Sequence, residues 1–317
     1  MWGQVVTLLV EQGLTNVTTA CKLFGHCRQA FYQLKSDYEH QSKRNGEIVE
    51  AVKEIRDEDP GIGCFKLFIM VCSIFGRDGV PGRDSFFKLL RRNKLMLICP
   101  KPRRTTNSNH RYHKYKNHIK GLIPSGPNQL WVSDITYINL DVGCCYLHLI
   151  TDAYSHMIVG WKLADTLKAA ITLDALSDAI NHTGRDDLTG LIHHSDRGIQ
   201  YCCDMYIDKL KQYNITISMT EDYKPTDNAI AERVNGIIKQ ERIYRGKYFK
   251  DVDQARYVIG RFITFYNIRR PHMSIGMLTP EIAHQQSGEQ KKMWKTKVYS
   301  SNKALEQKND VFLSTQQ

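Results

Sequence analysis

The chain has 317 residues, of which 42% are hydrophobic and 24% are charged, so it can form two or three globular domains with a sizeable core. Its longest apolar run, LFIMVCSIFG, has about half the length that crosses a bilayer, which argues against a membrane protein. None of the nine cysteines forms a C-x-x-C pair, so neither a zinc finger nor a disulfide framework is indicated. We expect reduced thiols and a cytoplasmic protein.

The positive charge is concentrated in one stretch. The formal net charge of the chain is +11, and residues 83–120 contain twelve Lys or Arg against one acid, Asp84, which also gives +11. A concentrated basic segment is typical of a protein that binds a polyanion, most often nucleic acid. A solvated linker is the alternative, and the two interpretations are compatible.

The N-terminal third predicts helices. Residues 1–36 contain short periodic apolar segments interrupted at Gly25, which predicts a helix-turn-helix-like unit. Residues 46–98 predict a second helical, DNA-binding-like domain. Its last helix carries Arg91 and Arg92 opposite an apolar face, so these side chains either lie in a DNA groove or belong to a solvated face.

Residues 99–128 predict a basic linker and a domain boundary, because they contain four prolines and two glycines. Arg103 and Arg104 in this segment are candidate DNA contacts. After the linker the pattern changes to strands and helices, which predicts an α/β domain over residues 129–286 with a mixed sheet flanked by helices. Residues 287–317 read as a polar tail.

Three acidic residues stand out in the predicted sheet domain. Asp134 lies within an otherwise apolar strand, where an unpaired carboxylate is costly. Asp196 ends another apolar strand, in the stretch LIHHSDRGIQY, and Glu232 lies on a later helix. An ordinary turn is the alternative for Asp196, since Gly198 follows it. Carboxylates at strand ends are suited to Mg²⁺ or Mn²⁺, and a pair of such ions can support phosphoryl transfer.

The helix with Glu232 has two contrasting sides. A helical wheel places Glu232, Asn235, Gly236 and Lys239 together. The opposite side is apolar and contains Ile230, Val234, Ile237 and Ile238. The polar side faces either a substrate or solvent, and the wheel leaves both open. Thr226–Asn228 predict the N-cap of this helix.

Three sequence blocks carry a family resemblance. WVSDITYI, HHSDRGIQY and DNAIAERVNGIIKQE resemble the catalytic blocks of DDE transposases of the retroviral-integrase superfamily, and in particular those from the long reading frame of bacterial insertion sequences. Asp196 and Glu232 are separated by 35 residues, as in that family. YLHLITDAYSHMIVGW and FYNIRRPHMSIGMLTPEIA also match, so the resemblance extends from about Glu47 to His284.

The resemblance implies an RNase H-like catalytic core preceded by α-helical helix-turn-helix domains. It implies that Asp134, Asp196 and Glu232 bind two divalent ions, Mg²⁺ or Mn²⁺, and that Lys239 contacts DNA near the scissile phosphate, with Asn235 beside it. The RRPH block implies three further DNA contacts, Arg269, Arg270 and His272.

Three other polar residues in the matching blocks receive less specific roles. Asp152 in TDAYS is interpreted as a hairpin turn residue. His193 and His194 adjoin Asp196, and we expect them to pack in the core or to support the acids indirectly. The stretch GIGCFKLFIM departs from the family, which usually has more basic residues there.

The function predicted from these features is that of a DNA transposase, which cleaves donor ends and transfers strands. The expected partners are double-stranded DNA, from the element ends and the target, and further copies of the chain. The resemblance also points to a companion protein from an upstream reading frame and to a bacterial, nucleoid-associated location. The alternatives are an inactive or domesticated DNA-binding protein, an RNase H-like nuclease and, with the poorest match, a tyrosine recombinase.

Overall fold

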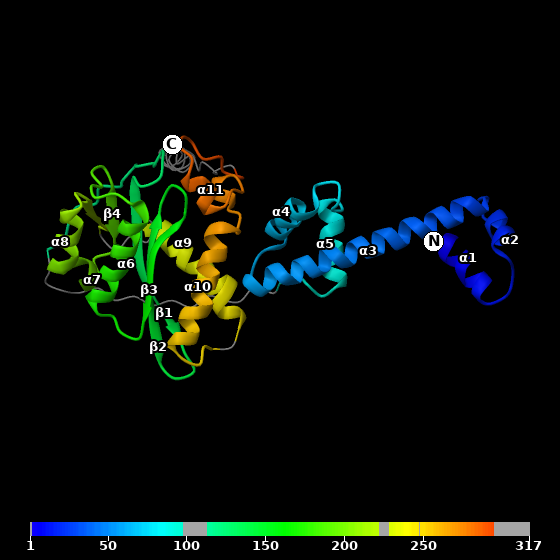
Figure 1. Cartoon of the computed structure of the whole chain (residues 1–317), viewed down its shortest axis with the longest axis horizontal. Helices are drawn as coiled ribbons and strands as arrows, with labels where there is room; N and C mark the ends of the chain where they lie inside the picture. The colour runs from blue at the N-terminus through cyan, green and yellow to red at the C-terminus, as the bar shows by residue number, and fades with distance from the viewer. Residues whose placement is uncertain (1, 98–112, 222–227, 247, 295–317) are drawn as a thin grey trace, which may run out of the picture.

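The computed structural model describes residues 2–97, 113–221, 228–246 and 248–294, with helices at one end of the molecule and a mixed sheet at the other (Figure 1). The first helices are α1 (Trp2–Glu11), α2 (Val17–Leu23) and α3 (Arg28–Glu58). A short turn joins α2 to α3, so helix, turn and helix follow one another in the region predicted to bind DNA. That binding role stays a prediction.

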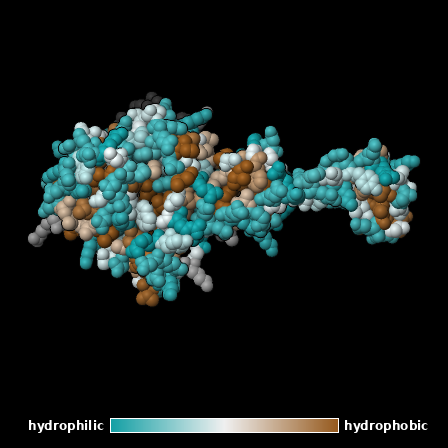
Figure 2. All heavy atoms as spheres, in the orientation of Figure 1, coloured by the Kyte–Doolittle hydropathy of each residue, from teal (hydrophilic) through white to brown (hydrophobic). Residues whose placement is uncertain are grey.

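α3 runs unbroken for 31 residues, through the predicted gap between residues 36 and 46. Every residue from Asp37 to Glu47 except Asn45 is exposed, and Figure 2 shows this stretch as narrow and largely hydrophilic. No proline interrupts it, and an established helix gains a hydrogen bond with each added residue. The two predicted helical units therefore share one helix, and no helix boundary separates them.

The second half of α3 packs against α4 (Cys64–Phe75) and α5 (Arg83–Arg92). The buried residues lie at helical spacing, for example Ile48, Val52 and Ile55 on α3. Phe265 from the sheet domain joins this core, so the helical region is docked onto that domain.

The sheet has five strands: β1 (Leu130–Asn139), β2 (Cys144–Asp152), β3 (Ile158–Ala164), β4 (Ile192–Ser195) and β5 (Thr216–Met219). Their order is β3-β2-β1-β4-β5. β1, β2 and β3 are antiparallel neighbours, whereas β4 pairs in parallel with β1, and β5 in parallel with β4. This arrangement confirms the predicted RNase H-like mixed sheet.

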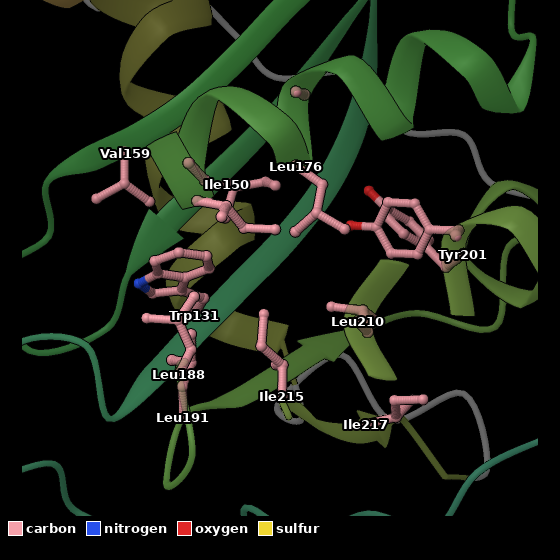
Figure 3. Packing of buried hydrophobic residues seen from close by; sticks show 14 of the residues in the cluster. Trp131, Ile150, Val159, Leu176, Leu188, Leu191, Tyr201, Leu210, Ile215 and Ile217 are labelled. Atoms are coloured by element: carbon pink, nitrogen blue, oxygen red, sulfur yellow. The ribbon is translucent and has the colours of Figure 1, made fainter. Parts of the chain in front are cut away.

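Helices cover both faces of the sheet. On one face Trp131 belongs to a large apolar cluster with Leu176 and Tyr201 (Figure 3). The helices of this face are α6 (Ala169–Thr183), α7 (Ile199–Cys202) and α8 (Asp204–Gln212). The other face is covered by α9 (Ala229–Ile237), its π-helical extension η2 (Ile238–Arg242), the 3₁₀ turn η3 (Ile243–Arg245) and α10 (Val252–Ile268). The short η4 (Met273–Ile275) and α11 (Pro280–His284) follow.

The described part of the predicted linker lies against the sheet. The backbone N–H of His118 donates to Ser218 Oγ at 2.9 Å, and the N–H of Met219 donates to the Lys116 carbonyl at 3.3 Å. The segment after residue 112 is therefore packed along the edge strand β5 and belongs to the sheet domain. Arg103, Arg104 and most of the predicted tail lie outside the described residues.

Candidate active site

Asp134 projects from the middle of β1 toward α9. Its carboxylate accepts hydrogen bonds from the Asn235 side chain at 2.7 Å and from the Ile135 backbone N–H at 2.9 Å. Burial raises the pKa of Asp134 to about 7, and the negative charge of Asp196 adds to the increase. Two hydrogen bonds thus hold a carboxylate in a place that disfavours its charge.

Asp196 is brought level with Asp134 by the register of two parallel strands. β1 and β4 pair Leu130 with Ile192 and Val132 with His194, and the same register continued by two residues matches Asp134 with Asp196. Neighbouring strands lie about 4.8 Å apart, so the two carboxylates share one end of the site. Asp196 Oδ1 accepts the Gly198 N–H at 2.9 Å. A Cβ on Gly198 would lie 2.9 Å from that oxygen, so a larger residue there would displace the Asp196 carboxylate.

Glu232 lies on a polar stripe that runs along α9, and its own side chain is exposed. Asn228, Glu232, Asn235 and Lys239 recur at the spacing of one helix face. Asn228 donates to the carbonyl of Ser133 at 3.0 Å, next to the Asn235–Asp134 bond. Asn228 and Asn235 are buried against β1, whereas Glu232 is exposed and Lys239 is half-buried, so the solvent-facing alternative stays open for Glu232.

Lys239 lies at the far end of the same stripe. Its ammonium is 4.7 Å from the centre of the Tyr137 ring, in a cation–π contact with β1. Burial lowers the pKa of Lys239, while Tyr137 and Asp134 counteract the change. The side chain is thus a partly covered cation close to the acids.

The donor set fits a hard divalent cation. The charge of Asp196 raises the pKa of Asp134, and that of Glu232 raises it more weakly. Asn235 Oδ1 is buried without a hydrogen-bond partner, so an oxygen acceptor in the site remains unsatisfied. Within residues 2–97, 113–221, 228–246 and 248–294, no three His, Cys, Asp or Glu side chains are close enough to hold a metal ion. Asp134, Asp196 and Glu232 are therefore not gathered closely enough in this structure to hold an ion together.

Comparisons with known proteins agree with this fold. Models of the integrase core domain match residues 124–225 and 213–280. A putative transposase for insertion sequence element IS986/IS6110 from Mycobacterium tuberculosis H37Ra is 30% identical over 244 residues, which are 75% of this chain and 86% of that protein. The chain belongs to the insertion-sequence transposases. Its function is therefore DNA transposition.

Two further proteins resemble this transposase. The insertion element IS600 31 kDa protein from Shigella sonnei is 32% identical over 268 residues, 82% of this chain and 95% of that protein. A chain in the cryo-EM structure of the simian T-cell lymphotropic virus intasome with PP2A regulatory subunit B56 gamma aligns with a TM-score of 0.46 and 17% identity, over 76% of this chain and 77% of that chain.

The RRPH block of the transposase lies at a domain junction, and two of its residues are inaccessible. Arg270 is 1% exposed and donates two hydrogen bonds to Glu241, at 2.6 and 2.7 Å, and His272 is 5% exposed and contacts Arg270. The prediction that Arg270 and His272 contact DNA is therefore wrong for this arrangement of the chain. Arg269 is partly exposed and pairs with Glu58 at the end of α3. This burial could not be predicted from the sequence, because the acidic partners are distant along the chain.

The structure also locates other residues that were singled out in the sequence. Arg91 and Arg92 are exposed at the end of α5, and their contact with DNA stays a prediction. Asp152 is buried and accepts hydrogen bonds from the N–H and hydroxyl of Ser155, each at 2.8 Å, which confirms it as a turn residue.

No helix in the described part of the chain is both long and apolar enough to span a membrane.

The histidines beside Asp196 are confirmed as core residues. His193 Nε2 lies 2.7 Å from Ser133 Oγ and 2.9 Å from the Tyr206 hydroxyl, and His194 Nδ1 lies 2.8 Å from Ser218 Oγ. Burial lowers the pKa of His193 to about 3, so its ring is neutral. Both rings join β4 to neighbouring elements, and neither is exposed.

Proposed function

We propose that this transposase cleaves DNA at the element's ends and joins the freed 3′-hydroxyl to a second phosphodiester, using Asp134, Asp196 and Glu232 as ligands of two Mg²⁺ or Mn²⁺ ions. The observation that carries the proposal is the β1–β4 register, which supports a shared site for the two aspartates beneath the helix of Glu232. The oxygen-only donor set supports Mg²⁺ or Mn²⁺ over softer metals.

In this proposal, the residues around the acids have distinct roles. Asn235 fixes one oxygen of Asp134 and so orients the carboxylate, and the Gly198 N–H does the same for Asp196. Lys239, whose charge is partly desolvated, would bind a non-bridging oxygen of the phosphodiester. When bound, a pair of divalent ions supplies Lewis acidity and neutralises charge that develops on the phosphate.

The DNA would extend beyond the acids over basic surfaces. Arg91 and Arg92 on α5, Arg269 and the residues Arg103 and Arg104 are the proposed backbone contacts, since Arg binds phosphate through paired N–H groups. We further propose that copies of the chain assemble on the two element ends, in the cytoplasm at the nucleoid, and that an upstream-frame companion protein takes part.

The test is strand transfer by the full chain with a duplex that carries an element end and Mg²⁺. Asp134→Asn and Glu232→Gln keep the shape of each side chain but remove its charge, so we expect a loss of at least about 100-fold in rate. Asp178→Asn is the matched control, because it removes an exposed acid that pairs with Lys162 on the surface. Unchanged strand transfer by either site variant would refute the assignment. DNA binding that persists in EDTA with no cleavage under any metal would favour the non-enzymatic alternative.

A further inference from the structure

A buried cluster of four charges joins the helical region to the sheet domain. Arg270 binds Glu241 through two hydrogen bonds, and its Nε lies 3.8 Å from Asp59 Oδ2 at the end of α3. Lys66 on α4 lies 3.4 Å from Glu241. Asp59 and Arg270 are almost fully buried, while Glu241 and Lys66 retain little exposure. Two acids thus balance two bases where α3 meets α10 (Figure 1).

The contact between the two parts is close at Gly61. The Gly61 N–H donates to Asp59 Oδ1 at 3.1 Å, which sets the turn between α3 and α4. A Cβ on Gly61 would lie 2.2 Å from Glu241 Cα and 2.6 Å from the Glu241 carbonyl oxygen. Both are backbone atoms of η2, so a side chain at residue 61 could be accommodated only if η2 moved as a whole. Only glycine permits this approach of the helical region to η2.

Glu241 belongs to the same continuous helix as Glu232. α9 ends at Ile237, and η2 follows at once as a π-helical segment. π-helical turns are rare and occur mostly as local insertions, often near functional sites. Because a helix is stiff over such a short length, the position of Glu241 limits how α9 can slide or rotate over β1.

Electrostatic interactions favour one protonation state of the cluster. Burial opposes ionisation of Glu241, but the Arg270 charge and its hydrogen bonds outweigh burial and lower the pKa of Glu241 to about 2. Burial and the Glu241 charge raise the pKa of Asp59 to about 8. Glu241 therefore stays ionised against Arg270, while Asp59 holds a proton near neutrality and can donate it in a hydrogen bond to Glu241.

We propose that Asp59, Gly61, Glu241 and Arg270 form a clamp through which the docked helical region positions the helix of Glu232. Arg270 and Glu241 are positioning residues in this view, because they act on catalysis through α9 without touching DNA. The inference rests on the proposed function for its activity readout, but its structural readout is independent of that function. It gives the RRPH block a role in assembling the active site.

The clamp is tested in the full chain with Gly61→Ala and the matched control Gly63→Ala. Gly63 has open space around its Cβ position and an ordinary φ of −70°, so alanine is tolerated there. We expect Gly61→Ala to lower the strand-transfer turnover by about 100-fold, as small misplacements of catalytic groups do, with DNA affinity within about twofold. Hydrogen exchange of the α9 amides should accelerate, while that of α6 stays as in the wild type.

A second pair of variants tests the charge. Arg270→Lys keeps the charge and should recover part of the turnover that Arg270→Met loses. Unchanged turnover and α9 exchange in Gly61→Ala would overturn the clamp, and so would a rate loss explained wholly by weaker DNA binding. If Asp134→Asn is inactive while Gly61→Ala is fully active, the clamp fails and the proposed function stands. If the wild type never joins strands, the proposed function fails, and accelerated α9 exchange in Gly61→Ala alone would still support the structural part of the clamp.

Discussion

The ionised carboxylate of Asp134 is energetically costly where it lies, but it is suited to bind a cation. Its carboxylate is half-buried, it is repelled by Asp196, and its principal side-chain partner is the neutral amide of Asn235. A cation between the two aspartates would remove the repulsion and make the buried charge favourable. The energetic penalty at this residue is therefore an argument for a metal site, made without reference to any relative.

Asp134→Asn should stabilise the metal-free protein at alkaline pH. The pKa of Asp134 in the folded state, about 7, exceeds its ordinary value of 3.8, so the folded state binds the proton more tightly and stability falls as pH rises through that interval. Asparagine cannot ionise, yet its carbonyl still accepts the Asn235 hydrogen bond. In EDTA at about pH 8, we expect the variant to melt several degrees above the wild type, at about 2–4 °C per kcal/mol.

The difference should disappear below about pH 3, where Asp134 is mostly protonated in both states. Added Mg²⁺ should raise the melting temperature of the wild type and leave that of the variant unchanged. Thermal unfolding followed by circular dichroism measures both effects. A variant that is less stable than the wild type in EDTA at every pH would contradict the repulsion between Asp134 and Asp196.

The acids could be predicted from the sequence, but only some of the residues that hold them in place could be. Asp134 and Asp196 were predictable because a carboxylate in an apolar strand is conspicuous, and the resemblance added Glu232. Asn228 was interpreted as an N-cap, and although it occupies that position, its side chain makes no capping bond and instead anchors α9 to Ser133. Arg270 was expected to contact DNA because RRPH matches a family block, whereas the structure buries it against Glu241. Such errors arise where the partner is remote in sequence and only the fold supplies it.

At the scale of elements, the junction of α3, α4 and η2 combines tight packing with buried charge. Breaking a buried ion pair from one side leaves the other charge without compensation, which usually costs about 3–5 kcal/mol. The junction lowers this cost because Glu241 is ionised against Arg270, while the proton that Asp59 holds near neutrality removes the repulsion between the two acids. The stability of the docked helical region should therefore depend on pH.

Asp59→Asn should flatten that pH dependence. The pKa of Asp59 is raised to about 8 from 3.8, so the folded state loses stability as the pH rises through that range. The lowered pKa of Glu241 acts on the acid side instead, where stability is lost as pH falls from its ordinary value toward about 2. Between about pH 6 and about pH 9, the wild type should lose more melting temperature than Asp59→Asn, by a few degrees at about 2–4 °C per kcal/mol. Parallel melting curves for the two proteins across this range would show that Asp59 does not titrate there.

At the scale of the whole molecule, α3 connects two parts that differ in how they are held. Its second half is packed against α4, α5 and α10, whereas its first half carries the small α1–α2 unit and crosses an exposed stretch. A helix of 31 residues is about 46 Å long, so it places the N-terminal unit well away from the sheet domain (Figure 1). The sequence predicted two helical units, 1–36 and 46–98, and the structure shows that α3 continues through the residues between them.

The exposed stretch of α3 should be the point where the two parts separate most readily. It is almost entirely exposed, although the Arg44 guanidinium lies 5.5 Å from the centre of the Phe75 ring on α4, and Ser42, Asn45 and Gly46 are poorer helix formers than alanine by about 2 kcal/mol in total. Trypsin should therefore cut after Lys43 and Arg44 sooner than after Lys53, which is also exposed but lies on the packed half of the helix. Replacing Ser42, Asn45 and Gly46 together by alanine should slow cleavage after Lys43 and Arg44 by about tenfold or more, because cleavage follows the population of the opened helix. The cleavage rate after Lys53 should not change, and fragment masses over time distinguish the sites. Equal rates at Lys43 and Lys53 in the wild type would mean that the helix is uniformly stable and that the N-terminal unit is carried rigidly by it.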